Sequence, residues 1–188
     1  MTVSGASVFR LVLLGLIAWL LQLTVVSQLT VFGVPADLTP LVVAYVGFIT
    51  GSTTGAVFGF GLGLFVDLTP EHTLGVNSLV FTAVGYLAGR VRELRDPAHG
   101  LAPVAVGAAA TVIAAIGFAL LQFLLGVQAP VSLLLLREIL LTVVLNTLLA
   151  LPVYAIMRRA LLPFLPEDPR RRRRRAYTTG GLSPISRL

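Results

Sequence analysis

The sequence contains no cysteine and no lysine, and only 12% of its 188 residues are charged. Without cysteine, disulfides, thiolate catalysis and cysteine-ligated metals are excluded. Soluble domains carry about 25% charged residues, so this chain has too few to cover a soluble surface. Hydrophobic residues make up 56% of the chain, and its mean hydropathy is +0.94. The composition therefore predicts an integral membrane protein with a single helical domain.

The net charge of +6 is carried by arginine, with six arginines in one run near the C-terminus. No aromatic residues are interleaved with the run, so a membrane surface is a better partner for it than nucleic acid. Three prolines and the like charges around them predict a disordered tail over residues 161–188. The predicted lipid-binding residues are Arg170, Arg171, Arg172, Arg173, Arg174 and Arg175.

Residues 1–160 form the predicted transmembrane domain, an all-α, polytopic bundle of about six helices. A helix needs about 20 residues to span a bilayer, and the second and third apolar segments are shorter than that. They could form one helix of about 30 residues, but GSTTG between them favours two short helices joined by a tight turn. The first segment is too long for a signal peptide, so we expect it to be retained. The segments are 9–32, 38–50, 54–68, 74–90, 101–125 and 132–157.

The distribution of arginine predicts the topology. With six spans both termini lie on one side, together with almost every arginine, while the opposite loops have none. The positive-inside rule makes that side cytoplasmic. Five spans would move Arg10 alone to the other side, so six is favoured.

Glycine recurs at every fourth position from Gly51 and the series ends at Asp67. A mid-helix glycine costs about 1 kcal/mol relative to alanine, so close packing has to offset the cost. Small residues let membrane helices approach closely, and VGYLAGR in the fourth segment repeats the spacing. The predicted helix-packing residues are Gly55, Gly59, Gly63, Gly85 and Gly89.

Asp67 has three interpretations from sequence. It could cap a wet turn, contact a partner or small ligand outside the cytoplasm, or bind metal with Glu71 and His72. One histidine is a weak metal signal, and we expect Asp67 to serve association more than folding. Asp37 on the same side is a plausible helix N-cap.

The remaining polar residues of the apolar segments have ordinary structural interpretations. Arg137 is expected to snorkel with Glu138 to the outer surface, or to pair with Asp67. No catalytic constellation or cofactor motif occurs, so the chain is expected to be neither an enzyme nor a cofactor-binding protein. Interhelical hydrogen bonds are predicted for Asn77, Gln122, Gln128 and Asn146.

Three stretches in order, ADLTPLVVAYVGF, GAVFGFGLGLFVDLT and LGVNSLVFTAVGYLAGRV, resemble the rod shape-determining MreD family. The family pattern is G-F-x-x-G-L-x-x-D, then L-G, then G-Y-x-x-G. Ala36 precedes Asp37 where the family usually has proline, so the upstream match is looser. The matching residues are Gly59, Phe60, Gly63, Leu64, Asp67, Leu74, Gly75, Gly85, Tyr86 and Gly89.

The resemblance implies a multi-pass protein of the bacterial inner membrane that scaffolds lateral peptidoglycan synthesis. Its implied partners are MreC, the actin-like MreB, the glycosyltransferase RodA and a class B penicillin-binding protein. The family is similar in fold to the S components of energy-coupling factor transporters, so a substrate-binding transporter subunit is the alternative. The residues predicted for partner binding are Asp37, Asp67, Glu71, His72, Gly75 and Asn77.

Overall fold

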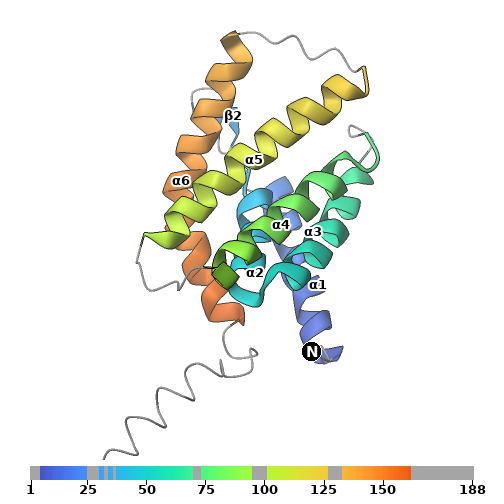
Figure 1. The fold of residues 1–188 in the computed structure, drawn as a ribbon, viewed down its shortest axis with the longest axis vertical. Helices are drawn as coiled ribbons and strands as arrows, with labels where there is room; N and C mark the ends of the chain where they lie inside the picture. Colours follow the sequence, from blue (N-terminus) through green and yellow to red (C-terminus); the bar gives the residue numbers. More distant parts are fainter. Residues whose placement is uncertain are drawn as a thin grey trace, which may run out of the picture.

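The computed structural model shows, within the residues that it describes, an all-α bundle of six helices with one short β-ladder (Figure 1). It describes residues 5–24, 30–31, 34–35, 37–69, 73–94, 101–126 and 133–161. The predicted tail, with its arginine run, lies outside these residues. The elements are α1 (Gly5–Thr24), β1 (Thr30–Val31), β2 (Val34–Pro35), α2 (Thr39–Thr50), α3 (Ser52–Asp67), α4 (Val76–Leu94), α5 (Ala102–Leu124) and α6 (Leu133–Leu161).

The prediction of one helix over residues 9–32 is wrong at its C-terminal end. Helix α1 ends at Thr24, and the antiparallel strands β1 and β2 follow, with Val31 paired to Val34. The β-branched residues of this stretch favour strands over helix. The link to α2 is fixed by Gln22 of α1, whose Oε1 accepts a hydrogen bond of 2.9 Å from the Leu38 backbone N–H.

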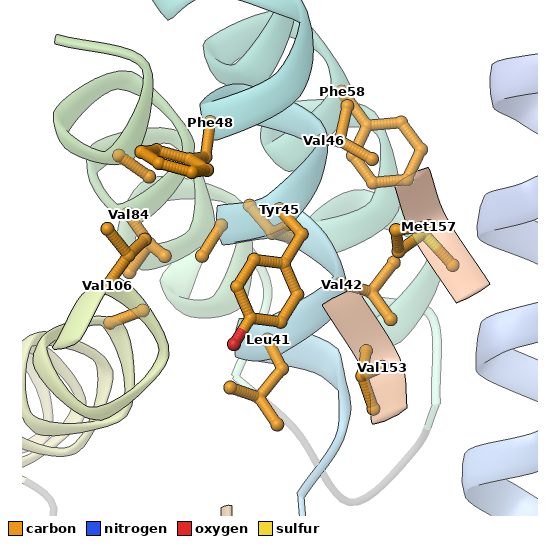
Figure 2. Close-up of a cluster of buried hydrophobic side chains, with 14 of the residues drawn as sticks. Leu41, Val42, Tyr45, Val46, Phe48, Phe58, Val84, Val106, Val153 and Met157 are labelled. Atoms are coloured by element: carbon orange, nitrogen blue, oxygen red, sulfur yellow. The ribbon is translucent and has the colours of Figure 1, made fainter. Parts of the chain in front are cut away.

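Helix α2 lies at the centre of the bundle, and every residue from Thr39 to Ile49 is buried. Figure 2 shows Tyr45 of α2 within a cluster of side chains from the helices around it. A helix that is apolar on all sides is stable when protein surrounds it. Its 12 residues extend about 18 Å, less than the ~30 Å hydrocarbon core, so α2 is too short to span the bilayer by itself.

Helices α2 and α3 are separate, as expected, but the turn between them is shorter than GSTTG suggests. Gly51 alone interrupts the helices, with φ 112° and ψ 170°. Its N–H donates to Gly47 O at 2.8 Å and closes α2, and Ser52 already belongs to α3. A positive φ is readily available to glycine, so one residue suffices to reverse the chain.

Two of the helices, α5 and α6, are long and apolar enough to cross a membrane. Large apolar side chains point outward along both helices, including Leu120, Phe123 and Leu148, which are 55%, 72% and 72% exposed. Extended exposed apolar surface is rare on soluble monomers. The outer surfaces of α5 and α6 are therefore suited to contact with lipid.

The chain brings its charged helix ends to one end of the bundle. Figure 1 shows the N-terminal end of α1, the α2–α3 break and the C-terminal ends of α4 and α6 at the lower end. Arg90 and Arg92 of α4 lie there with Arg158 and Arg159 of α6, so we name it the arginine end. The end where α3 meets α4 through residues 68–75 is named the Asp67 end.

Candidate functional site

The face that α3 turns toward α4 is made of Gly55, Gly59 and Gly63. A Cβ atom added to any of them would come within 3.0 Å of backbone atoms of the facing helix. On Gly59 it would meet the Phe81 carbonyl, and on Gly63 it would meet the Ser78 backbone. The two backbones thus touch along the glycine series, which a side chain of any size would prevent.

Helix α4 contributes Gly85 and Gly89 to the same contact. A Cβ on Gly85 would meet the Gly55 carbonyl, and a Cβ on Gly89 would meet Ser52 Cα. Gly47 of α2 also belongs here, since its Cβ would meet the Gly85 carbonyl. Sequence analysis missed Gly47, although it lies four residues before Gly51 and continues the spacing upstream. We name these six glycines, together with Ser52 and Ser78, the glycine seam.

Asp67, the last residue of α3, is buried at one end of the glycine seam and is 1% exposed. Its carboxylate accepts five hydrogen bonds from the first turn of α4 and the residue before it. The donors are Gly75 N at 3.0 Å, Asn77 N at 3.0 Å, Asn77 Nδ2 at 2.8 Å, Ser78 N at 3.0 Å and Ser78 Oγ at 2.7 Å.

These bonds make Asp67 the N-terminal cap of α4. The first N–H groups of a helix have no intrahelical partners, and a carboxylate there also interacts favourably with the helix dipole. Both carboxylate oxygens are occupied by α4 groups, and Arg137 is exposed at the start of α6. The geometry therefore gives Asp67 a role in the fold, and the association role expected from sequence stays a prediction.

Glu93 forms the corresponding cap at the arginine end. Its Oε1 accepts hydrogen bonds from Ser52 N at 3.0 Å and Ser52 Oγ at 2.6 Å, at the first residue of α3. Arg90 pairs with Glu93 at 3.2 Å, and Arg92 donates to the Ile49 carbonyl near the end of α2. Each of α3 and α4 thus caps the N-terminus of the other with a carboxylate.

The electrostatics of this second cap follow from its bonds. Glu93 lies beyond the apolar stretch 74–90 of α4, and its side chain is exposed. The hydroxyl and N–H of Ser52 hydrogen-bond the ionised carboxylate and lower the pKa of Glu93 below its usual value. Glu93 is therefore held in the charged form that a helix N-terminus prefers.

Exposed leucines lie on either side of the Asp67 cap. Leu68 is 72% exposed and Leu74 is 74% exposed, and Gly75 turns the chain into α4 with φ 92°. Asn77 is 4% exposed because it is one of the Asp67 donors. Glu71 and His72 lie outside the described residues, and no group of three possible metal ligands occurs within them. Among the described residues of this end, Leu68 and Leu74 therefore offer exposed apolar surface.

The residues near Asp37 tie the start of α2 to α5 and α6. Asp37 Oδ1 accepts a bond of 2.9 Å from Thr39 N, while the Asp37 carbonyl accepts one of 2.8 Å from Asn146 Nδ2. The same nitrogen donates to Thr111 Oγ1 at 3.1 Å. Asn146 is fully buried and Gln122 is exposed, whereas Gln128 lies outside the described residues. Asn146 thus joins α6 to α5 and to the loop before α2.

Comparison with known proteins identifies one family. The model of the rod shape-determining protein MreD matches residues 5–160 of this chain. The match includes all six helices, the glycine seam and both carboxylate caps. Neither a curated protein nor a solved structure matches the chain. Since the family model covers most of its length, the chain belongs to the MreD family of rod shape-determining membrane proteins.

Proposed function

We propose that this protein is a non-enzymatic scaffold subunit of the complex that elongates rod-shaped cells, and that it binds an MreC-like protein. The family match over residues 5–160 is the observation that carries the proposal. A rigid platform suits such a role, and the glycine seam with its two caps provides one. A RodA-type glycosyltransferase and a class B penicillin-binding protein are the further partners.

The partner surface that we propose is the Asp67 end, with Asp37, Asp67, Glu71, His72, Gly75 and Asn77 as its residues. Asp67 and Asn77 are buried, so their part is to hold the turn in place. Leu68 and Leu74 add exposed apolar area that the sequence analysis did not select. Burying apolar area contributes about 25 cal/mol per Å², so these two leucines can anchor a partner.

The orientation that we propose places the arginine end in the cytoplasm, with six passes of the chain along the bundle, the short buried α2 among them, and both termini on that side. Positively charged residues are retained on the cytoplasmic side during insertion, and the arginines near the C-terminal ends of α4 and α6 gather at one end. The arginine run at 170–175 then lies next to the inner leaflet, where anionic lipids attract it.

The alternative from sequence, a substrate-binding subunit of an energy-coupling factor transporter, gains no support from the described residues. A vitamin-sized ligand needs a pocket with convergent polar groups. The cavity of about 360 Å³ between α1 and α3 has a nearly all-apolar lining and no such convergent polar groups.

A site-specific crosslinking experiment in native membranes tests the proposal. A photo-crosslinking amino acid replaces Leu74 at the Asp67 end, or Leu148 on the apolar face of α6 as a matched exposed control. Capture of an MreC-like protein from position 74, and less or none from position 148, is the expected result. Capture of a pair of ATPases, or equal capture from both positions, would overturn the proposed surface.

A further inference from the structure

The cavity between α1 and α3 is a groove that helix packing leaves open. Gly15 brings α1 close to α3, since a Cβ there would lie 3.2 Å from Phe58 Cε2. Beside this contact, Trp19 of α1 and Thr53, Thr54, Gly61 and Phe65 of α3 line a space of about 360 Å³. We name this space the α1–α3 groove.

Gly61 is the residue that helix packing does not explain. The other helical glycines of α3 meet backbone atoms, but nothing lies within 4 Å of a Cβ on Gly61. A glycine within a helix costs about 1 kcal/mol relative to alanine, and no contact with α4 offsets that cost at this position. The absence of a side chain at Gly61 deepens the groove. The cost of a glycine within α3 is therefore accounted for if a ligand occupies the space above Gly61.

The size of the groove indicates which membrane component can enter. It follows α3 from Thr53 to Phe65, a length of about 18 Å at 1.5 Å per residue. A helix of that length and about 10 Å diameter has a volume of roughly 1,400 Å³, so it would remain mostly outside a space of about 360 Å³. A single extended hydrocarbon chain is much thinner and fits the long, narrow shape.

The polarity of the lining gives the direction in which such a chain lies. Apart from the indole N–H of Trp19 on α1, the polar side chains of the lining are Thr53 and Thr54, which both lie at the arginine end, in the first turn of α3. Thr53 is exposed and Thr54 is half-buried, so both hydroxyls can reach a polar headgroup. An amphiphile would thus place its headgroup at the arginine end and its chain toward Phe65.

We propose that the α1–α3 groove binds one acyl chain of a membrane phospholipid from the leaflet at the arginine end, with the headgroup beside Thr53 and Thr54. This inference requires the membrane setting of the family but not the proposed partner. The lipid fills the space between α1 and α3, and it couples the N-terminal helix to the rest of the bundle.

Trp19, the sole tryptophan in the sequence, reports directly on the groove. The full chain is reconstituted in vesicles of ordinary phosphatidylcholine with increasing fractions of phosphatidylcholine brominated in its acyl chains. Bromine quenches tryptophan on contact. We expect wild-type quenching to exceed that of Gly61→Phe at every fraction, because the Cβ at position 61 meets open space and the phenylalanine ring beyond it occupies the groove.

Ala83→Phe is the matched control, since Ala83 is exposed on α4 away from the groove. It should keep wild-type quenching, and all three proteins should melt alike in detergent. In native mass spectrometry, wild type and Ala83→Phe should retain one phospholipid that Gly61→Phe loses. The double variant Thr53→Val, Thr54→Val should retain less bound phospholipid than wild type, because the headgroup contacts are gone while the groove keeps its shape.

Two results would overturn the inference. One is equal quenching of Gly61→Phe and wild type, which would show that Trp19 meets only bulk lipid. The other is that brominated lipid does not quench Trp19 in the native complex and that no phospholipid is retained. Together these two observations would show that another protein chain covers the groove. Loss of the MreC-like partner without change in either lipid readout bears on the proposed function alone.

Discussion

Asp67 shows how a membrane bundle can hold a carboxylate at 1% exposure. Burying an ionised carboxylate without partners is very unfavourable, but a buried charge is tolerated where hydrogen bonds replace water. The first turn of α4 supplies unpaired backbone donors, and the Asn77 and Ser78 side chains add two more. The same bonds that satisfy the acid also satisfy the helix, so Asp67 and the start of α4 stabilise each other.

Asp67→Asn is therefore expected to destabilise the protein. Asparagine keeps the shape but turns an amide N–H₂ toward donors, so at least one buried donor loses its acceptor. Hydrogen bonds to charged groups contribute about 1.5–3 kcal/mol each, so the free energy of unfolding should fall by at least about 2 kcal/mol. Equilibrium unfolding in mixed detergent micelles measures the change.

Asp37→Asn is the matched control for this prediction. Asp37 is half-buried, and asparagine can still accept from Thr39 N through its side-chain oxygen. It should unfold within about 0.5 kcal/mol of wild type, because the bond from Thr39 N to the side-chain oxygen is kept and the backbone carbonyl that Asn146 contacts is unchanged. If Asp67→Asn is as stable as Asp37→Asn yet loses the MreC-like partner, Asp67 serves association, as the sequence suggested.

At the scale of elements, α3 and α4 form a unit in which each helix completes the other. The glycine seam lets the backbones touch, and Asp67 and Glu93 cap the facing helix at opposite ends. The hydrophobic effect does not drive helices together within lipid, so close contact and satisfied polar groups have to supply the stability. This unit and α2 form the centre of the bundle.

Gly63→Leu should break this unit. The leucine side chain would meet the Ser78 and Asn77 backbone, which cannot move aside without separating α3 from α4. Overpacking a well-packed core lowers the free energy of unfolding by about 1–3 kcal/mol. Because the leucine would meet backbone atoms, we expect Gly63→Leu to cost about 3 kcal/mol or more. Membrane abundance and detergent melting should both fall.

Gly61→Leu, two residues away on α3, tests whether the destabilisation depends on the position of the leucine or only on the loss of a glycine. It meets open space, so it should fold like wild type or better, since leucine favours helix over glycine by nearly 1 kcal/mol. Equal accumulation and equal melting of the two leucine variants would mean that the glycine seam does not hold α3 to α4.

At the scale of the whole molecule, charge is distributed along the bundle axis. The seam glycines and the apolar outer faces occupy the middle, while the arginines near the C-terminal ends of α4 and α6 lie at one end and Arg137 lies near the start of α6. This distribution suits a protein that lies across a membrane with its basic end on an anionic surface. The arginine run at 170–175 extends the same pattern beyond the described residues.

A peptide of residues 164–180 should bind vesicles that contain anionic lipid and dissociate at high salt. Each arginine near such a surface contributes about 1 kcal/mol, and screening weakens the attraction as ionic strength rises. Cosedimentation with vesicles at two salt concentrations measures this. A peptide with the six arginines replaced by glutamine is the control, and equal binding of the arginine peptide to neutral vesicles would contradict the prediction.

The sequence by itself determined the class of the protein, the approximate helices and the family. Hydropathy and the scarcity of charge depend on composition and local spacing, so they can be read without knowing contacts. Most predicted segments match the observed helices closely; the segment 38–50, for example, corresponds to α2 (Thr39–Thr50). The first segment failed because apolar, β-branched residues suit a strand as well as a span.

The tertiary structure decided what the individual polar residues do. Asp67 could be a wet cap, a partner contact or a metal ligand until the first turn of α4 was placed against it. The pairing of Glu93 with Ser52 joins residues 41 apart, which no local pattern encodes. The fourfold spacing already separates Gly63 from Gly61, but only the structure shows that a Cβ on Gly63 would meet the Ser78 backbone while one on Gly61 would meet open space. Such contacts depend on which helix lies opposite, and that follows from packing of the whole bundle.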